Sequence, residues 1–156
     1  MGTDEAETIY RGCVLPADLY YAVDADVWVR LEGDGQVTLG MTDPAQTRCG
    51  KMVHIAFKRV GRQIEKGQSV ATVESGKWVG PVPSPFAGEL VATNQAAFDR
   101  DILVANRDPY GAGWLVRLRP RDLAMDLAGM RTGAEAINLY RRRIDEMEVR
   151  CFRCED

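Results

Sequence analysis

The apolar residues of this chain fall into short runs separated by turns, and this spacing limits the possible fold more than any other feature. Residues 27–32 and 37–39 flank Gly33-Asp34-Gly35, and an Asp-Gly pair supplies the positive φ angles that a tight hairpin requires. Further runs with strand character lie at 19–23, 52–57, 69–75, 78–82, 89–93 and 114–118. Short strands at such regular turn spacing predict a mainly β protein, folded as a sandwich or barrel.

The two ends of the chain differ from this central part. We expect residues 1–17 to form an irregular arm and residues 18–130 to form the β domain. Residues 131–156 are predicted to form a C-terminal helix and a tail that contains a Cys-x-x-Cys motif. One ordinary domain with terminal extensions accounts for the length of 156 residues.

Two helices are predicted from their caps and spacing. A short one covers residues 43–49, with Thr42 or Asp43 as the N-cap and Gly50 at its end. The C-terminal helix begins at a capping box formed by Thr132 and Glu135. Its apolar face consists of residues at steps of three and four, namely Ile137, Tyr140, Ile144 and Met147.

Charge and hydropathy exclude several functional classes. The formal net charge of −3 provides no general attraction to nucleic acid or to anionic lipid. No apolar run is long enough to span a bilayer, and the acidic residues 1–7 lack the layout of a secretory signal. We therefore expect a cytoplasmic protein that interacts with neither nucleic acid nor membrane.

Four cysteines are present, and in a cytoplasmic protein a structural disulfide framework is not expected. Cys13 and Cys49 are isolated and are interpreted as small apolar packing residues. Cys151 and Cys154 continue the stripe of the C-terminal helix, so an extended helix would place both on its apolar face. Our hypothesis is a redox pair that forms when the last turn frays; packing at a helix end is the alternative.

One lysine stands out by its position in a turn. Lys77 follows Gly76 between two runs with strand character, and Glu74 precedes it by three residues. Glycine at position 76 relaxes the restriction on φ, so Lys77 is expected at a hairpin tip with its amine in water. A second turn follows, with Gly88 and Glu89 leading into the next strand. An accessible lysine of this kind suits enzymatic modification, although most surface lysines are only solvated charges.

This hairpin resembles the lipoyl-attachment hairpin of glycine cleavage H proteins. Other matching segments are Trp28-Val29-Arg30, Gly33-Asp34-Gly35, Thr42-Asp43, Asn94, Asn106, Asp108-Pro109-Tyr110-Gly111 and Gly113-Trp114-Leu115. The resemblance implies a flattened barrel of two antiparallel sheets, a barrel-sandwich hybrid, with short helices. It also implies a non-catalytic carrier with lipoic acid in amide linkage to Lys77, where Glu74 contributes to recognition by a lipoate ligase or lipoyl transferase.

Several positions depart from the usual H-protein pattern. Asp26 and Val27 stand where H proteins usually have His-Glu, Lys51 stands where an aspartate usually follows Gly50, and residues 78–83 replace a more polar run. The chain is more similar to the H-protein-like lipoate-binding proteins of sulfur-oxidising bacteria and archaea. That resemblance implies sulfur-containing cargo and a heterodisulfide-reductase-like iron–sulfur flavoprotein complex as partner.

Other functions are weighed against this one. The first alternative is an H protein that carries the aminomethyl group between glycine cleavage enzymes, and the second is a scaffold or lipoate reservoir without cargo. Biotin is disfavoured because biotin carriers typically place methionine on both sides of the lysine, whereas here the neighbours are Gly76 and Trp78. His54 is the sole histidine, so the sequence offers no obvious zinc site.

Overall fold

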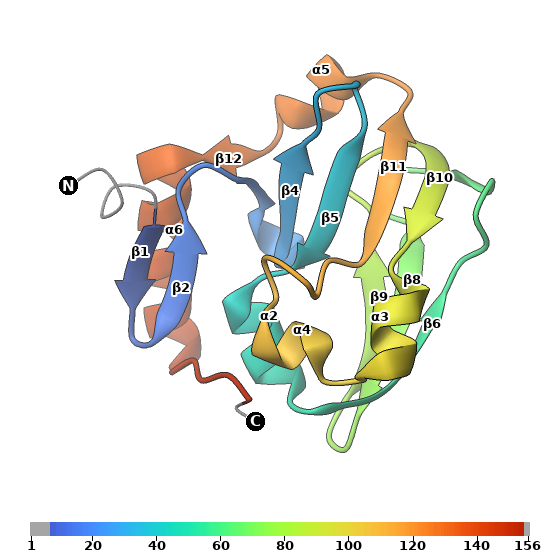
Figure 1. The fold of residues 1–156 in the computed structure, drawn as a ribbon. Helices are drawn as coiled ribbons and strands as arrows, with labels where there is room; N and C mark the ends of the chain where they lie inside the picture. The colour runs from blue at the N-terminus through green and yellow to red at the C-terminus, as the bar shows by residue number, and fades with distance from the viewer. Residues whose placement is uncertain (1–6, 155–156) are drawn as a thin grey trace.

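The computed structural model of the protein describes residues 7–154, and its main feature is a pair of antiparallel sheets (Figure 1). The larger sheet has seven strands in the order β12-β3-β4-β5-β11-β10-β7, and the smaller has the order β6-β8-β9. The strands of the larger sheet are β3 (Tyr20–Ala22), β4 (Val27–Leu31), β5 (Val37–Met41), β7 (Gln63–Ile64), β10 (Gly88–Thr93), β11 (Val116–Pro120) and β12 (Arg131–Thr132). Those of the smaller sheet are β6 (Met52–Phe57), β8 (Ser69–Ser75) and β9 (Val79–Pro83). The predicted mainly β fold with two antiparallel sheets is confirmed.

Strand β4 shows how the sheet separates two apolar cores. Val29 pairs with Leu39 of β5, and both side chains are buried in the core between the sheets. Trp28 points to the opposite face and belongs to a second buried cluster with Tyr140. Its indole Nε1 donates a hydrogen bond to the carbonyl of Pro109 at 2.9 Å, so the polar edge of the buried ring is satisfied. Alternate side chains of one strand therefore stabilise two different parts of the molecule.

The helices are short except for the last. They are the 3₁₀ helix η1 (Val23–Ala25) and the α-helices α2 (Asp43–Cys49), α3 (Gln95–Arg100), α4 (Val104–Arg107), α5 (Leu123–Leu127) and α6 (Gly133–Met147). Thr42 caps α2 by accepting a hydrogen bond from the Ala45 N–H, and Gly50 ends it, as predicted. None of the helices found in residues 7–154 combines the length and the apolar character needed to cross a bilayer.

The C-terminal helix begins after Thr132 and buries the predicted face, but the predicted hydrogen bonds at its N-cap are not formed. Ile137, Tyr140 and Ile144 are buried against the second core, whereas Met147 is 40% exposed. The predicted capping box is wrong, because the Thr132 hydroxyl donates to the carbonyl of Leu19 instead of accepting from the helix. Glu135 forms an ion pair with Arg131.

The predicted irregular arm is, in its described part, a hairpin. Strand β1 (Glu7–Tyr10) pairs antiparallel with β2 (Cys13–Pro16). The turn between them places both Arg11 and Gly12 at positive φ. Figure 1 shows this hairpin in front of α6. Residues 1–6 and 155–156 of the predicted terminal segments lie outside the described residues.

The pairing of the cysteines differs more from our predictions than any other feature of the fold. Cys13 and Cys151 form a disulfide across a sequence separation of 138 residues, so the expected absence of a structural disulfide is wrong. The structure also contradicts the proposed redox pair, because the sulfur of Cys151 bonds Cys13 and Cys154 is a free thiol. Helix α6 ends at Met147, with Glu148 in the left-handed conformation, so Cys151 and Cys154 do not continue its apolar face.

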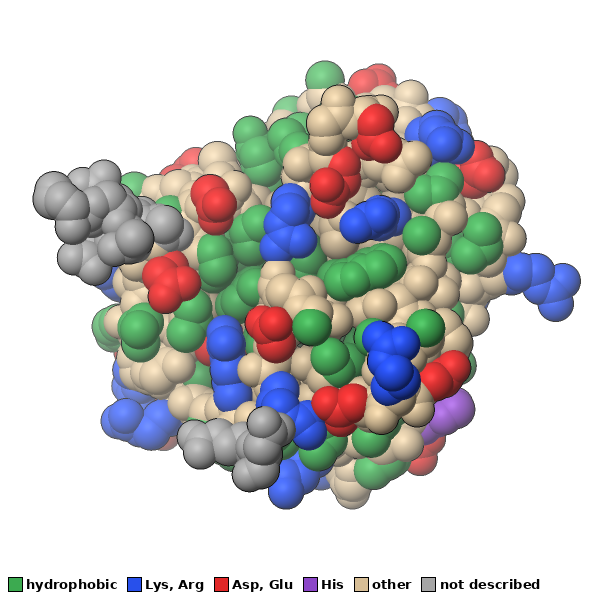
Figure 2. Space-filling model, in the orientation of Figure 1, with side chains coloured by type: hydrophobic (Ala, Val, Ile, Leu, Met, Phe, Trp, Pro, Cys, Tyr) green, Lys and Arg blue, Asp and Glu red, His purple; other side chains and the backbone are tan. Residues whose placement is uncertain are grey.

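Figure 2 shows acidic and basic side chains interspersed over the face of the molecule seen in Figure 1. This mixture agrees with the small net charge of the sequence. Among the described residues, no group of three or more His, Cys, Asp or Glu side chains is arranged to hold a metal ion.

Candidate functional site

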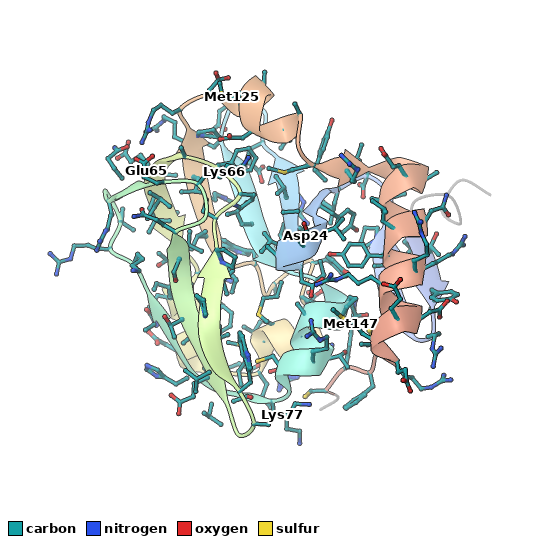
Figure 3. The ribbon with its side chains drawn as sticks, turned by 180° about the vertical axis from the view of Figure 1, so that it is seen from behind. Asp24, Glu65, Lys66, Lys77, Met125 and Met147 are labelled. Atoms are coloured by element: carbon teal, nitrogen blue, oxygen red, sulfur yellow. A yellow bond between two sulfur atoms is a disulfide. The ribbon has the colours of Figure 1, made fainter. Side chains whose placement is uncertain are left out.

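Lys77 lies at the tip of the hairpin between β8 and β9. Glu74 pairs with Val79 across these strands, and the Ser75 N–H donates to the Trp78 carbonyl at 2.8 Å, which closes a tight turn around Gly76 and Lys77. The Lys77 side chain is exposed. Figure 3 shows it at the end of the molecule opposite Glu65 and Lys66. The predicted hairpin-tip position is confirmed.

The expected reason for Gly76 is wrong. Gly76 does not have a positive φ, and a Cβ added to it would meet nothing within 4 Å. The glycine that matters for the shape of this site is Gly50, which ends α2 with φ of 85° and ψ of −174°. A Cβ on Gly50 would lie 2.9 Å from Cε of Lys77. The lysine side chain therefore passes over Gly50. The positive φ is what favours glycine there, because the end of the lysine side chain could move away from a Cβ.

The base of the turn is held by a buried hydroxyl. Ser75 is 7% exposed, and its Oγ donates to the carbonyl of Cys49 at 2.6 Å while accepting the Lys77 N–H at 3.2 Å. One side chain thus links the lysine turn to the end of α2. Because both partners are backbone groups, the link fixes the path of the chain on either side.

A buried amide completes this support. The side chain of Asn106 is 1% exposed and donates through Nδ2 to the Gly50 carbonyl at 2.9 Å. Its Oδ1 accepts the Met52 N–H at 3.0 Å. The sequence pointed to Asn106 only as one of many family-like residues, because its partners lie more than fifty residues away. We call Cys49, Gly50, Lys51 and Met52 the lysine seat.

A cleft of about 360 Å³ opens beside the lysine hairpin. Trp78, Pro81 and Val82 of the hairpin form one wall. The opposite side is formed by residues of η1, β4, β5, α2 and α6, namely Asp24, Ala25, Asp26, Val27, Met41, Ala45, Arg48, Cys49 and Arg143. Since Trp78 directly follows Lys77, a flexible group attached to that lysine starts at the edge of this cleft.

The buried charge in the cleft is Asp26, in a left-handed conformation with φ of 56°. Its Oδ1 accepts from the Tyr140 hydroxyl and from Nε of Arg143, each at 3.2 Å. Its Oδ2 accepts from Arg48 Nη1 at 3.2 Å and Arg143 Nη2 at 3.4 Å. A carboxylate offers about four acceptor positions, so these four contacts saturate it.

This cluster also affects how its members titrate. Partial burial lowers the pKa of Arg143, but the hydrogen bond to Asp26 and the charge of that carboxylate outweigh it, so the pKa is raised overall. Burial first, and then the charge of Asp26, raise the pKa of Tyr140. Both side chains therefore remain hydrogen-bond donors to Asp26 over the whole physiological range.

Cys49 contributes a thiol to the cleft wall. It is 4% exposed and not disulfide-bonded. Burial raises its pKa, against smaller lowering effects from the Ser75 hydroxyl and the Lys77 ammonium. The group is thus a protonated, apolar part of the wall near neutral pH, which agrees with the packing role expected for it.

Three further residues singled out in the sequence are exposed at or next to the smaller sheet. Glu74 is exposed and pairs with exposed His54 across β8 and β6. Lys51, one of the departures from the H-protein pattern, is also exposed. Lys77 and Glu74 are therefore presented together at the surface, whereas Asp26 and Val27 line the cleft.

Comparison with known proteins places this geometry in a family. The model for the glycine cleavage H-protein matches residues 19–141. The chain belongs to the glycine cleavage H-protein family. Members of this family are non-catalytic proteins that carry lipoate covalently on a lysine.

Three relatives illustrate the similarity. Glycine cleavage system H protein 2 of Aquifex aeolicus is 46% identical over 142 residues, which cover 91% of this chain and 88% of the relative. Probable glycine cleavage system H protein 2 of Sulfolobus acidocaldarius is 39% identical over 149 residues, covering 94% and 99%. The crystal structure of a glycine cleavage system H protein from Mycobacterium marinum superposes with a TM-score of 0.67 at 30% identity, covering 81% and 98%.

Proposed function

We propose that this H-protein family member carries lipoate on Lys77 and uses it to transport sulfur-containing intermediates. Attachment at Lys77 is supported by its geometry. The side chain is exposed at the tip of a turn whose base is fixed by buried hydrogen bonds. An attaching enzyme, a lipoate ligase or a lipoyl transferase, can reach this amine without unfolding the domain. Glu74, exposed on the same hairpin, is available to that enzyme for recognition.

The chemistry of lipoate supports sulfur as the cargo. When bound, the group supplies a dithiolane whose sulfurs undergo thiol–disulfide exchange. The protein contributes no general base and needs none, since its role is to present the arm. Tethering raises the effective concentration of the cargo at each docked partner.

The buried carboxylate of the cleft is not available to the aminomethyl cargo of glycine cleavage. An aminomethyl group bears a basic amine, and its natural partner in a cleft would be an available carboxylate. Asp26 already accepts four hydrogen bonds from Arg48, Arg143 and Tyr140. The exposed Asp24 is the other carboxylate at this cleft, so two carboxylates and two guanidinium groups balance and give an ammonium no net attraction. A sulfur-linked fragment needs no such attraction.

The length over which the chain aligns with its relatives supports its membership in a specialised branch of the H-protein family. The numbered H proteins 2 and 3 of Aquifex aeolicus align over 142 and 148 residues, whereas the H protein of Thermus thermophilus aligns over 109. An organism with several numbered H proteins has members available for different cargoes. We propose a heterodisulfide-reductase-like iron–sulfur flavoprotein complex as the docking partner of this chain.

Two alternatives remain, and a specific observation favours the first. The 42% identity to the Thermus thermophilus protein named as glycine cleavage system H protein favours carriage of the aminomethyl group between glycine cleavage enzymes. A scaffold or lipoate reservoir would use the same fold without loading the arm.

One assay separates the cargoes. The lipoylated protein is supplied to glycine decarboxylase and aminomethyltransferase, and glycine-dependent methylene transfer is measured beside an authentic H protein, with Lys77→Arg as the unlipoylated control. We expect the rate of glycine-dependent methylene transfer to be no higher than with the Lys77→Arg variant. We also expect a deletion strain of the native host to lose thiosulfate oxidation. Turnover comparable to the authentic H protein would overturn the sulfur proposal in favour of glycine cleavage.

A further inference from the structure

The C-terminal residues 151–154, which we call the strap, lie across α2 and beside α4. The Phe152 carbonyl accepts hydrogen bonds from Gln46 Nε2 at 2.9 Å and from the Thr47 hydroxyl at 3.3 Å. The Cys154 N–H donates to the backbone carbonyl of Asn106 at 3.1 Å. The strap therefore contacts the same two elements that support the lysine seat.

The beginning of the strap is fastened covalently. Cys151 forms the disulfide with Cys13 of β2, and the Cys151 N–H donates to the Arg11 carbonyl at 3.0 Å. After this point the strap is held by hydrogen bonds, by the ion pair of Arg153 with Asp43, and by the Arg153 guanidinium lying over the Tyr110 ring. The Phe152 side chain is 72% exposed. The disulfide is thus the strongest constraint on a segment that has little apolar burial of its own.

Two buried amides connect the strap to Lys77. Gln46 is 2% exposed; its Nε2 donates to the Phe152 carbonyl of the strap at 2.9 Å and to Asp43 Oδ1 at 2.8 Å. Its Oε1 accepts from Asn106 Nδ2 at 3.2 Å. Asn106 in turn bonds the carbonyl of Gly50 and the N–H of Met52. Gly50 lies directly under the lysine side chain. The contacts are continuous from the disulfide to the lysine seat.

We infer that Gln46 and Asn106 are positioning residues for Lys77, and that the Cys13–Cys151 disulfide determines how firmly they hold the lysine seat. A dithiol that reduces this disulfide breaks the S–S bond, leaves thiols at Cys13 and Cys151, and is itself oxidised to a disulfide. The strap is then free to leave Gln46, which keeps its hydrogen bond to Asp43 but loses the one to the Phe152 carbonyl. The seat becomes more mobile, and Lys77 spends less time in its held position.

Amide hydrogen exchange measured by NMR tests the coupling directly, in unlipoylated protein. The Met52 N–H, bonded to Asn106, reports on the seat, and the Lys58 N–H, bonded to the Val70 carbonyl beyond the other end of β6, is the internal control. On reduction with dithiothreitol, we expect the exchange of Met52 to accelerate about tenfold more than that of Lys58. Equal acceleration of both amides would show general destabilisation alone and would overturn the inference.

A variant separates the amide link from the disulfide. Gln46→Glu keeps an acceptor for Asn106 and leaves the disulfide in place, but it removes the donor to Phe152 and the donor to Asp43 Oδ1 at 2.8 Å. The variant is therefore also made together with Asp43→Asn, which removes the repulsion between the two carboxylates, and Asp43→Asn alone is the background. We expect the same selective acceleration at Met52 in the oxidised variant, and no change in Gln63→Glu, a matched substitution at an exposed glutamine of β7. A Gln46→Glu variant with wild-type exchange at Met52 would contradict the role of Gln46.

A second readout concerns attachment and rests on the proposed function. A purified lipoate ligase is given lipoate, ATP and each oxidised carrier, and KM and kcat are separated. If the seat is held in only a fraction of Gln46→Glu molecules, the KM for the carrier rises by the inverse of that fraction, about threefold, while kcat is unchanged. A fall in kcat alone would contradict positioning. If wild-type Lys77 accepts no lipoate, the proposed attachment fails, and the exchange measurement still decides the coupling.

Discussion

The turn that carries Lys77 has a tip and a base, and the structure constrains them very differently. At the tip, Gly76 has open space around it and Lys77 is exposed. At the base, Gly50 adopts a backbone conformation reserved for glycine, and Asn106 and Ser75 are buried with their polar atoms paired. The difference shows how a carrier can combine a fixed starting point for its arm with a free end for reaction.

Loss of the buried amide of Asn106 should destabilise the base of the turn more than any other single change. Asn106→Ala leaves the Met52 N–H, the Gly50 carbonyl and Gln46 Oε1 without their partner. Unsatisfied buried groups cost the desolvation of each, so we expect a loss of about 3 kcal/mol in the free energy of unfolding, measured by urea denaturation. Asn138→Ala, at an exposed position on α6, is the control and should change stability little. A similar small effect at Asn106 would show that the base is not held as described.

Gly50→Ala should have the next largest effect. The combination of φ 85° and ψ −174° is strained for any residue with a Cβ, and the new methyl group would meet Cε of Lys77. We expect a loss of about 2 kcal/mol in the free energy of unfolding. If Lys77→Ala restored part of the loss in the double variant, the contact between the lysine and its seat would be shown independently of the backbone strain.

Ser75→Ala should cost less, because it removes one hydroxyl and leaves the strand pairing intact. The Cys49 carbonyl and the Lys77 N–H lose a partner, and we expect about 1 kcal/mol of destabilisation in the same urea titration. Thr72→Ala removes an exposed hydroxyl from the same strand and serves as the comparison. Equal losses in the two variants would contradict a special role for the Ser75 hydroxyl.

The smallest effect is expected at the tip. Gly76→Ala places a methyl group in open space at a residue without positive φ, so the free energy of unfolding should change by no more than about 0.5 kcal/mol. Urea denaturation next to Gly50→Ala makes this a direct contrast between two glycines near one lysine. Strong destabilisation at Gly76 would remove the distinction between tip and base.

Features with a local sequence signal were predictable. The Asp-Gly turn, the cap at Thr42 and the stripe of α6 depend on neighbouring residues, and each has its structural counterpart. The hairpin of β1 and β2 was missed because Arg11 occupies a positive-φ position for which the usual signals are Asn or Asp followed by Gly.

The missed features of the site are long-range. The disulfide partners are 138 residues apart, and pairing among four cysteines cannot be deduced from spacing. Asn106 reaches Gly50 across 56 positions. The sequence located the lysine that the site presents, whereas only the structure shows what holds it in place.

Lys77 is proposed as the lipoyl lysine, and mass spectrometry of protein from its native host can locate the modification without a coupled assay. Intact mass followed by tryptic mapping should show one lipoyl group, located on Lys77 and absent from a Lys77→Arg variant expressed in the same host. An unmodified native protein would support a scaffold, and a lipoyl group on Lys51, Lys58 or Lys66 would contradict the account of the site.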